Sequence, residues 1–219
     1  MDSIKTIIIA GGTHGNELTG IKLYEKWAID SKCYADRCPS AKITLVHTNI
    51  EATEACRRYI DLDLNRSFAE SLLSLESPGA YEIRRAQELN KRFGPKGRDT
   101  RTDLLIDIHN TTANMGICLI LSARDPFTMR ASAELANEFP NAHIYYQPEE
   151  RSESPYFGTI AKADICLEVG PQPHGTIDAK LFRETEQVVL RYLELAEEWN
   201  AGSLQKKPRR KVDIYTQYR

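Results

Sequence analysis

Short apolar runs alternate along this chain with longer segments in which apolar residues recur at helical spacing. Residues 4–10 are rich in β-branched side chains, as expected of a central strand that is covered on both faces. Residues 17–30 then show the period of a helix with one apolar face. Strands that alternate with helices in this way predict a mostly parallel sheet with helices on both faces. The other expected strands are 42–49, 103–110, 116–123, 141–147 and 164–169, and the other expected helices are 50–60, 78–93, 125–139 and 178–199.

The composition is that of a globular α/β protein. A chain of 219 residues with 41% hydrophobic residues can bury the core of one such domain. Its 29 basic and 31 acidic residues give a net charge of −2, which argues against nucleic acid or an anionic membrane as the main partner. No apolar run approaches the length of a membrane span. The five cysteines include no Cys-x-x-Cys pair and indicate neither a disulfide framework nor a structural zinc site.

Polar side chains stand where several of the expected strands end. His14 follows the first strand, His109 lies at the end of the strand 103–110, and Glu168 lies near the end of the strand 164–169. In a doubly wound sheet, ligands bind outside the carboxyl ends of the strands. The coincidence of these three positions therefore predicts a functional site at one edge of the sheet.

The first strand ends in a double glycine that allows a tight turn. Gly11 and Gly12 precede His14 and Glu17, which are three residues apart at the start of a helix. The turn leaves both side chains exposed on one side of the chain, where they suit a metal ion. The alternative is a simple turn followed by an acidic residue at the N-terminus of a helix.

A second pair of polar residues lies in the strand 103–110. Asp107 and His109 are two residues apart and therefore share a face, so Asp107 is placed to orient the ring of a metal-bound His109. A hydrogen-bonded histidine at a polar strand end is the alternative. With His14 and Glu17, His109 makes a set of three ligands that leaves a fourth zinc position open for water. Zinc lowers the pKa of such a water and polarises a bound carbonyl.

Glu168 interrupts an otherwise apolar strand. A carboxylate is costly to bury, so Glu168 is expected to face a cleft or a partner. As a general base it would take the proton of the zinc-bound water and pass it to the leaving amine. The alternative is a structural ion pair with an arginine.

The polar segment 58–66, which begins at the end of the expected helix 50–60, carries two further arginines of interest. Its alternating Asp-x-Asp-x-Asn pattern imitates a calcium loop, but Arg66 stands where that loop needs glycine, which excludes the EF-hand. Arg66 and Asn65 instead offer a planar fork and an amide that suit a carboxylate. Arg58 is placed to stabilise the oxyanion that forms when a carbonyl is attacked.

Four polar motifs span most of the chain. They are G-G-T-H-G-N-E-L-T-G (11–20), R-Y-I-D-L-D-L-N-R (58–66), D-I-H-N-T-T-A-N-M-G (107–116) and E-V-G-P-Q-P-H-G (168–175). Together, and in this order, they resemble the aspartoacylase family. These are metal-dependent N-acyl-amino-acid amidohydrolases, related to the succinylglutamate desuccinylases and distantly to the zinc carboxypeptidases. The resemblance implies a zinc-carboxypeptidase-like fold around a mixed, mostly parallel sheet.

The resemblance also implies a role for each residue already singled out. Glu168 is expected to be the catalytic glutamate, and Arg58 to polarise the substrate. Asn65 and Arg66 are expected to hold its free carboxylate. The implied reaction releases acetate from an N-acetyl-L-amino acid, in the first place N-acetyl-L-aspartate. The expected ligands of one zinc ion per chain are His14, Glu17 and His109.

Two features depart from the pattern of the family. The family member that cleaves N-acetylaspartate has an arginine ten residues before its catalytic glutamate, a position held here by Gly158, although Arg151 in the same loop offers a substitute. The family also continues into a C-terminal β domain, whereas this chain stops at Arg219. We therefore expect a catalytic domain over residues 1–204, and a linker with the start of a truncated β domain over residues 205–219.

Two alternatives to an N-acetylaspartate deacylase stay open. Gly158 favours a deacylase for other N-acetyl amino acids with neutral or aromatic side chains. The shortened C-terminus favours a truncated, non-catalytic zinc-binding module. A small-molecule N-acyl amino acid is the expected partner of the enzyme, and a homodimer is compatible with the sequence. The sequons at Asn65 and Asn110 fall within the expected site, where glycosylation would block it, so the cytoplasm is the expected compartment.

Overall fold

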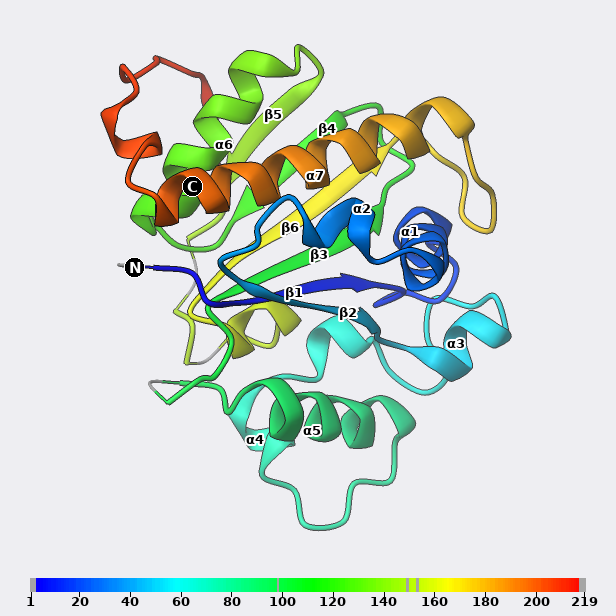
Figure 1. Cartoon of the computed structure of the whole chain (residues 1–219). Helices are drawn as coiled ribbons and strands as arrows, with labels where there is room; N and C mark the ends of the chain where they lie inside the picture. The colour runs from blue at the N-terminus through cyan, green and yellow to red at the C-terminus, as the bar shows by residue number, and fades with distance from the viewer. Residues whose placement is uncertain (1–2, 98, 149, 153, 217–219) are drawn as a thin grey trace.

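The computed structural model describes residues 3–97, 99–148, 150–152 and 154–216. Within these ranges one seven-stranded sheet has the order β2-β1-β3-β6-β4-β5-β7, and helices cover both of its faces (Figure 1). The strands are β1 (Thr6–Gly11), β2 (Lys42–His47), β3 (Leu104–Asn110), β4 (Gly116–Leu121), β5 (Ala142–Tyr146), β6 (Ala163–Gly170) and β7 (Ile214–Thr216). The helices are α1 (Leu18–Ile29), α2 (Lys32–Ala35), α3 (Ile50–Glu54), α4 (Glu70–Leu73), α5 (Tyr81–Phe93), α6 (Pro126–Glu138) and α7 (Ala179–Asn200), with 3-10 turns η1 (Leu64–Arg66), η2 (Phe157–Ile160) and η3 (Leu204–Lys206).

The sheet consists of two parallel blocks that run in opposite directions. Strands β2, β1, β3 and β6 are parallel, β4 pairs antiparallel with β6, and β5 and β7 continue parallel to β4. The expected mostly parallel, mixed sheet with helices on both faces is confirmed. Because they are parallel, β1, β2, β3 and β6 present their carboxyl ends at one edge of the sheet, which is the edge where ligands bind in such folds.

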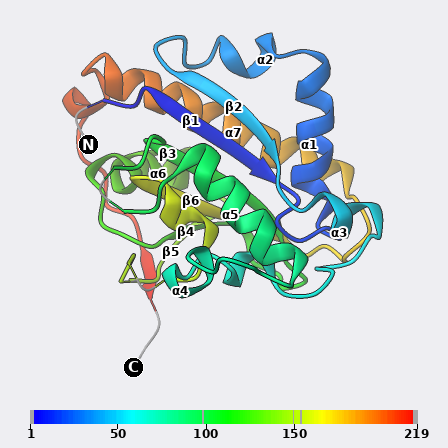
Figure 2. The same cartoon turned by 90° about the horizontal axis from the view of Figure 1, so that it is seen from below.

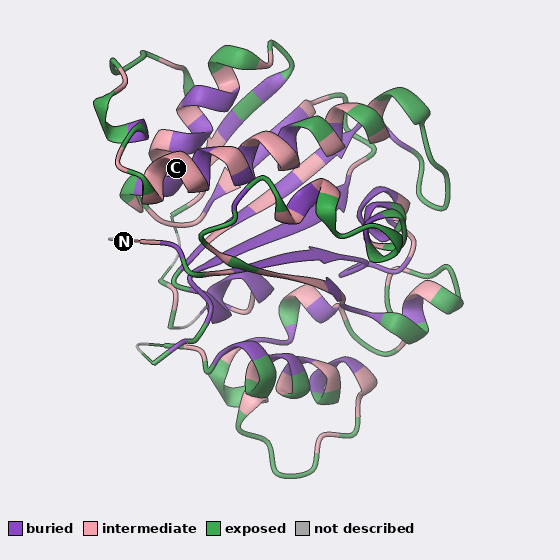
Figure 3. Ribbon diagram, viewed as in Figure 1, coloured by how far each residue is buried: buried purple, intermediate pink, exposed green. Residues whose placement is uncertain are grey.

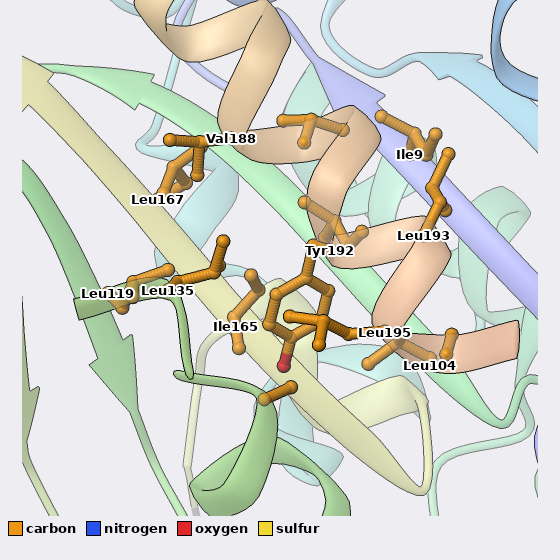
Figure 4. Close-up of a cluster of buried hydrophobic side chains, with 14 of the residues drawn as sticks. Ile9, Leu104, Leu119, Leu135, Ile165, Leu167, Val188, Tyr192, Leu193 and Leu195 are labelled. Carbon is orange, nitrogen blue, oxygen red and sulfur yellow. The ribbon is translucent and has the colours of Figure 1, made fainter. Parts of the chain in front are cut away.

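The two faces of the sheet have cores of different size. On one face Ile9 and Ile165 pack with Tyr192 of α7 in the larger core, whose centre is shown in Figure 4. On the other face Ile8 packs with Leu89 of α5 in a smaller core. Figure 2, seen from below, shows α5 in front of this second face. The smaller core leaves the carboxyl ends of β3 and β6 on that face to polar side chains.

Burial and capping follow from the local sequence. Every residue of β3 is buried, and the helices turn their exposed faces outward (Figure 3). Asp125 caps α6 by accepting hydrogen bonds from the backbone N–H groups of Phe127 and Thr128, and Pro126 occupies the first turn as expected. Asp178 caps α7 by accepting from Leu181 N at 2.7 Å. None of the helices in the described ranges combines the length and hydropathy that crossing a bilayer requires.

The expected elements differ from the observed ones mainly in short helices and ends. Residues 31–41 lie outside the helices and strands expected above but contain α2, and α4 was not predicted either. The helix expected over residues 50–60 ends at Glu54, because Cys56 adopts a φ of 47° and turns the chain.

The C-terminal segment joins the sheet. Within the segment expected to begin a truncated β domain, residues 214–216 form β7, which pairs parallel with β5. The domain boundary expected between residues 204 and 205 stays a prediction. Residues 217–219 of the expected second segment lie outside the described residues.

Candidate metal centre and active site

The turn after β1 carries two buried polar side chains. Gly12 follows β1 with a φ of +79°, a left-handed conformation that glycine adopts without strain. The chain then places His14 and Glu17 in the interior, with 4% and 2% of their surface exposed. Glu17 N donates a hydrogen bond to the carbonyl of His14 at 3.1 Å, which closes the turn before α1 begins.

The three expected ligands converge at the carboxyl ends of β1 and β3. His14 Nδ1 lies 2.7 Å from Glu17 Oε1, and His109 Nδ1 lies 2.9 Å from Glu17 Oε2. The two Nδ1 atoms are 3.2 Å apart. One candidate ligand atom from each of the three residues lies within 4.8 Å of those of the other two, and all three residues are buried.

Each histidine turns its outer nitrogen toward a carboxylate. His109 Nε2 lies 2.8 Å from Asp107 Oδ2, and the other oxygen of Asp107 accepts a hydrogen bond from Thr13 Oγ1 at 2.8 Å. His14 Nε2 lies 3.0 Å from Asp63 Oδ1. A carboxylate at Nε2 favours the tautomer that carries its proton there, which leaves the Nδ1 lone pair free for a cation. The expected contact between Asp107 and His109 is confirmed.

This set of donors fits a metal ion. Two nitrogen lone pairs that face each other at 3.2 Å repel unless a proton or a cation lies between them. Two histidine nitrogens and one carboxylate are also the ligands of a class of catalytic zinc sites, in which a fourth position stays open. His14, Glu17 and His109 are therefore residues that could hold a metal ion.

Two carboxylates beside the histidines have lowered pKa values, which keeps them ionised at neutral pH. Burial raises the pKa of Glu17, but the charges and hydrogen bonds of His109 and His14 outweigh burial and hold that pKa well below its usual range. Burial likewise raises the pKa of Asp63, but the hydrogen bonds and charges of His14 and Arg58 outweigh burial and hold that pKa below its usual range. Burial lowers the pKa of His109, but the Asp107 carboxylate outweighs it, so the net pKa lies above the usual value. Ionised carboxylates around two histidines attract a cation.

Glu168 faces the same site from β6. It is the register partner of His109 in the parallel pair β3–β6, so both side chains lie on one face of the sheet. Its Oε2 atom is buried and has no hydrogen-bond partner among the described residues. Burial raises the pKa of Glu168 above the usual value. The expectation that this glutamate faces a cleft is confirmed, because it lines the cavity described below.

Arg58 stands beside the candidate ligands. Its Nη1 donates to Glu17 Oε1 at 3.3 Å, and its Nη2 donates to Asp63 Oδ2 at 3.1 Å. About 40% of its side chain stays exposed, so the guanidinium can still meet a ligand. Asp63 thereby bridges Arg58 and His14, a role that the sequence did not reveal.

Asn65 and Arg66 lie further along the same loop. Asn65 Oδ1 accepts a hydrogen bond from Phe157 N at 2.9 Å. The side-chain N–H groups of Asn65 can therefore donate to a ligand. The guanidinium of Arg66 stacks on the ring of Tyr156 at 4.5 Å from the centroid. Neither Asp63 nor Tyr156 was predicted as part of the site. Asp63 belongs to the motif 58–66, which could have pointed to it. Tyr156 is distant in the sequence and reaches Arg66 only in the folded protein.

A cavity of about 260 Å³ connects these groups. Glu168 and Cys166 line it from β6. The loop residues Arg58, Asn65 and Arg66 also line it. Further lining residues are His14, Asp107, Ile120, Ser122, Gln147, Tyr156, Gly158, Thr159, Asp164 and Ile165.

Arg151, the expected substitute for a substrate-binding arginine, is engaged elsewhere. Its guanidinium donates to Ser122 Oγ at 2.9 Å, to the carboxylate of Asp164, and to the carbonyls of Gly158 at 3.1 Å and Ala161 at 2.6 Å. A Cβ added at Gly158 would lie 2.3 Å from Asp164 Oδ2. Asp164 therefore occupies the space into which a longer side chain at position 158 would project.

Comparison with known proteins places the chain in a family. The model of the succinylglutamate desuccinylase/aspartoacylase catalytic domain matches residues 3–196. The chain belongs to this family. An N-acyl-aromatic-L-amino acid amidohydrolase (carboxylate-forming) of Homo sapiens is 36% identical over 207 residues, which cover 92% of this chain and 64% of that protein. The aspartoacylase of Mus musculus is 38% identical over 219 residues, 98% of this chain and 69% of that protein.

Solved structures of the succinylglutamate desuccinylase/aspartoacylase family share this fold. Murine aminoacylase 3 matches with a TM-score of 0.86 and 35% identity, covering 92% of this chain and 67% of the other. The succinylglutamate desuccinylase of Vibrio cholerae matches with a TM-score of 0.67 at 18% identity, covering 99% and 62%, and is alike in fold alone. The chain spans 64% and 62% of the lengths of the human and rat N-acyl-aromatic-L-amino acid amidohydrolases.

Proposed function

We propose that this chain is a zinc-dependent amidohydrolase that releases the carboxylate from an N-acyl-L-amino acid. The observation that carries the proposal is the convergence of His14, Glu17 and His109 beside the unpartnered carboxylate oxygen of Glu168. The names of the similar amidohydrolases and aspartoacylases support the same reaction class. A small-molecule N-acyl amino acid is the proposed partner, and the cytoplasm is the proposed compartment.

The residues of the site divide the proposed chemistry among them. A zinc ion on the three ligands, when bound, supplies a water of lowered pKa and polarises the scissile carbonyl. Glu168 accepts the proton of the attacking water and donates it to the leaving amine, and its raised pKa suits both transfers. Arg58 lies beside Glu17 and stabilises the negative charge that develops on the carbonyl oxygen.

Asn65 and Arg66 bind the free carboxylate of the amino acid in this proposal. A guanidinium binds a carboxylate in a bidentate manner, and an amide N–H adds a further donor. Arg66 is held for this task by the ring of Tyr156 and by a hydrogen bond from its Nη1 to the carbonyl of Asn65 at 2.8 Å.

The side chain of the substrate is a separate choice, and the cavity favours an uncharged one. N-acetyl-L-aspartate would bring a second carboxylate into a cavity whose described lining includes Arg58 and Arg66, both already assigned to other groups of the substrate. Arg151 is paired with Asp164, and the Asp164 carboxylate itself lines the cavity. A second substrate carboxylate would therefore be buried without a cation of its own, which is unfavourable. We therefore propose neutral or aromatic N-acetyl amino acids over N-acetyl-L-aspartate.

Acetate release from a panel of N-acetyl amino acids tests both choices. We expect the zinc-loaded chain to hydrolyse N-acetyl-L-phenylalanine with a kcat/KM about 10-fold or more above that for N-acetyl-L-aspartate. The opposite preference would restore N-acetyl-L-aspartate as the substrate. Zinc bound at one ion per chain without any acetate release would favour the non-catalytic zinc-binding module instead.

Substitution of Glu168 tests its proposed catalytic role. Glu168→Ala should retain zinc and lose about 10²- to 10⁴-fold in kcat, because it removes the proton acceptor and leaves the ligands in place. His14→Ala, measured alongside, should lose both zinc and turnover. An active Glu168→Ala protein would refute the role as general base.

A further inference from the structure

A carboxylate of helix α5 is buried beneath the loop 58–66. Glu82 is completely buried, with 0% of its surface exposed. It accepts hydrogen bonds from the three consecutive backbone N–H groups of residues 60–62, at 2.6, 3.0 and 3.0 Å. Asn49 Nδ2 donates the fourth, at 3.2 Å. Each oxygen of Glu82 thus accepts two hydrogen bonds.

All four donors to Glu82 are neutral groups. Burial of a carboxylate is costly, and here the cost is offset by hydrogen bonds rather than by an opposite charge. Consecutive N–H groups that converge on one anion form a concave backbone nest. Hydrogen bonds to an ionised acceptor are shorter and stronger than those between neutral groups. Glu82 therefore fixes the backbone conformation of residues 60–62.

The loop makes a reciprocal contact with the helix. Asp61 Oδ2 accepts a hydrogen bond from Tyr81 N, the first residue of α5, at 2.8 Å. The residue at the N-cap position of α5, Ala80, has no side chain that could do so. A carboxylate of the loop thus caps the helix, while a carboxylate of the helix binds the loop. The two contacts lock the loop onto the N-terminus of α5.

The locked loop carries side chains that reach the candidate metal ligands. Arg58 contacts Glu17 at 3.3 Å, and Asp63 contacts His14 at 3.0 Å. We infer that Glu82 is a positioning residue, which holds Arg58 and Asp63 where they meet the ligands without touching the substrate itself. The inference rests on the proposed function, since it is there that Arg58 acts on the substrate.

Glu82→Gln separates this role from simple packing. Glutamine preserves the volume of the side chain but replaces an oxygen that accepts two hydrogen bonds with an amide that donates, so donors would face donors. We expect the amides of residues 60–62 to exchange with solvent about 10-fold faster or more. We also expect kcat/KM to fall about 10- to 100-fold. Zinc content should stay at one ion per chain.

Glu88→Gln on the same helix is the matched control. The side chain of Glu88 is 61% exposed and pairs with Arg85, so its substitution should leave both the exchange rates and kcat/KM at wild-type values. Wild-type exchange at residues 60–62 together with unchanged kcat/KM in Glu82→Gln would overturn the inference. The exchange measurement needs no substrate. If the wild-type chain releases no acetate, the proposed function is contradicted. The exchange rates would still show whether Glu82 anchors the loop.

Asp61→Ala covers the case in which Glu82→Gln fails to fold. Asp61 is exposed, and its substitution removes only the cap on Tyr81 N while Glu82 stays in place. We expect faster exchange at Tyr81 and a smaller acceleration at residues 60–62. Unchanged exchange at residues 60–62 in Asp61→Ala would show that loop and helix are not locked together, and would overturn the inference.

Discussion

The orientation of two imidazole rings is the critical feature of the site at the scale of single residues. Asp107 and Asp63 each hold the Nε2 atom of one histidine, at 2.8 and 3.0 Å. Both Nδ1 atoms are thereby directed at the same point, together with the carboxylate of Glu17. A metal ion held at this point would thus depend on carboxylates that do not bind it themselves.

Removal of one orienting carboxylate should weaken metal binding without abolishing it. We expect Asp107→Asn to lower the affinity for zinc about 10- to 100-fold, because the amide no longer fixes the tautomer of His109. Competition with a chromophoric chelator measures the affinity. Asp36→Asn, a substitution at an exposed position, serves as the control and should leave the affinity unchanged. Equal affinities for both variants would show that Asp107 does not tune the metal site.

Contacts between single residues could be predicted from the sequence only where both residues lie on the same regular element. Asp107 could be assigned to His109 because residues two apart on a strand share a face. Asp63 lies 49 residues from His14, and only the folded loop brings them together. Glu82 is one of several charged residues in its helix, and nothing in the sequence showed that it would be buried and turned toward the loop 58–66.

At the scale of elements, the close packing of α1 on the sheet sets the position of the turn that carries His14 and Glu17. A Cβ added at Gly20 would lie 2.9 Å from the carbonyl oxygen of Ile108 in β3 and 3.0 Å from Gly11 Cα in β1. Both neighbours are backbone atoms that cannot move independently of the sheet. Because Glu17 directly precedes α1, this contact also controls where that ligand stands.

Alanine at this position should therefore destabilise the fold. We expect Gly20→Ala to lower the free energy of unfolding by about 1–2 kcal/mol, since overpacking outweighs the gain of about 1 kcal/mol in helix propensity. Urea denaturation measures the change. Gly79→Ala is the control, because a Cβ at Gly79 meets nothing within 4 Å. Gly20→Ala as stable as wild type would contradict the packing argument.

A buried aspartate joins the beginnings of two central strands. Asp103 Oδ2 accepts hydrogen bonds from Lys5 N at 2.8 Å and Thr6 N at 3.0 Å, and Lys162 Nζ lies 2.7 Å from Oδ1. Burial raises the pKa of Asp103, but the hydrogen bond from Lys162 and those from the two backbone amides outweigh it, so the net pKa lies below the usual value. The folded protein therefore keeps this carboxylate ionised to lower pH than the unfolded chain does.

This depressed pKa gives the stability of the protein a defined pH dependence. The contribution of Asp103 is complete above the pKa of the unfolded chain, about 4, and is lost as the pH falls through the lower pKa of the folded state. We expect Asp103→Asn to cost about 1–3 kcal/mol at pH 7. The difference from wild type should shrink below about pH 4. Urea denaturation across this pH range measures it, and a difference independent of pH would contradict the assignment.

The directions of the strands could be read in part from the sequence. Only residues 111–115 connect β3 to β4, which is too short for a crossover between parallel strands, so β4 had to run against β3. The insertion of β6 between these two strands had no local signal. Short helices such as α2 and α4 were missed because four residues are too few to show a period.

At the scale of the whole molecule, the fold delivers distant residues to one edge of the sheet. His14 follows β1, His109 ends β3 and Glu168 comes from β6, and the register of these three adjacent strands aligns them. The sequence predicted this convergence because strands of a parallel block end at the same edge. It did not predict that Tyr156 lines the cavity, because the position of this residue depends on how the loop before β6 packs.

Calorimetric titration of zinc into the metal-free chain tests the central claim most directly. We expect one zinc ion per chain for the wild type, and the same stoichiometry for Glu168→Gln, because Glu168 is proposed to act on the bound water and not on the metal. His14→Ala should lose this binding, since it removes one of three converging ligands. Zinc binding by His14→Ala with the affinity and stoichiometry of the wild type would contradict the assignment of the metal centre.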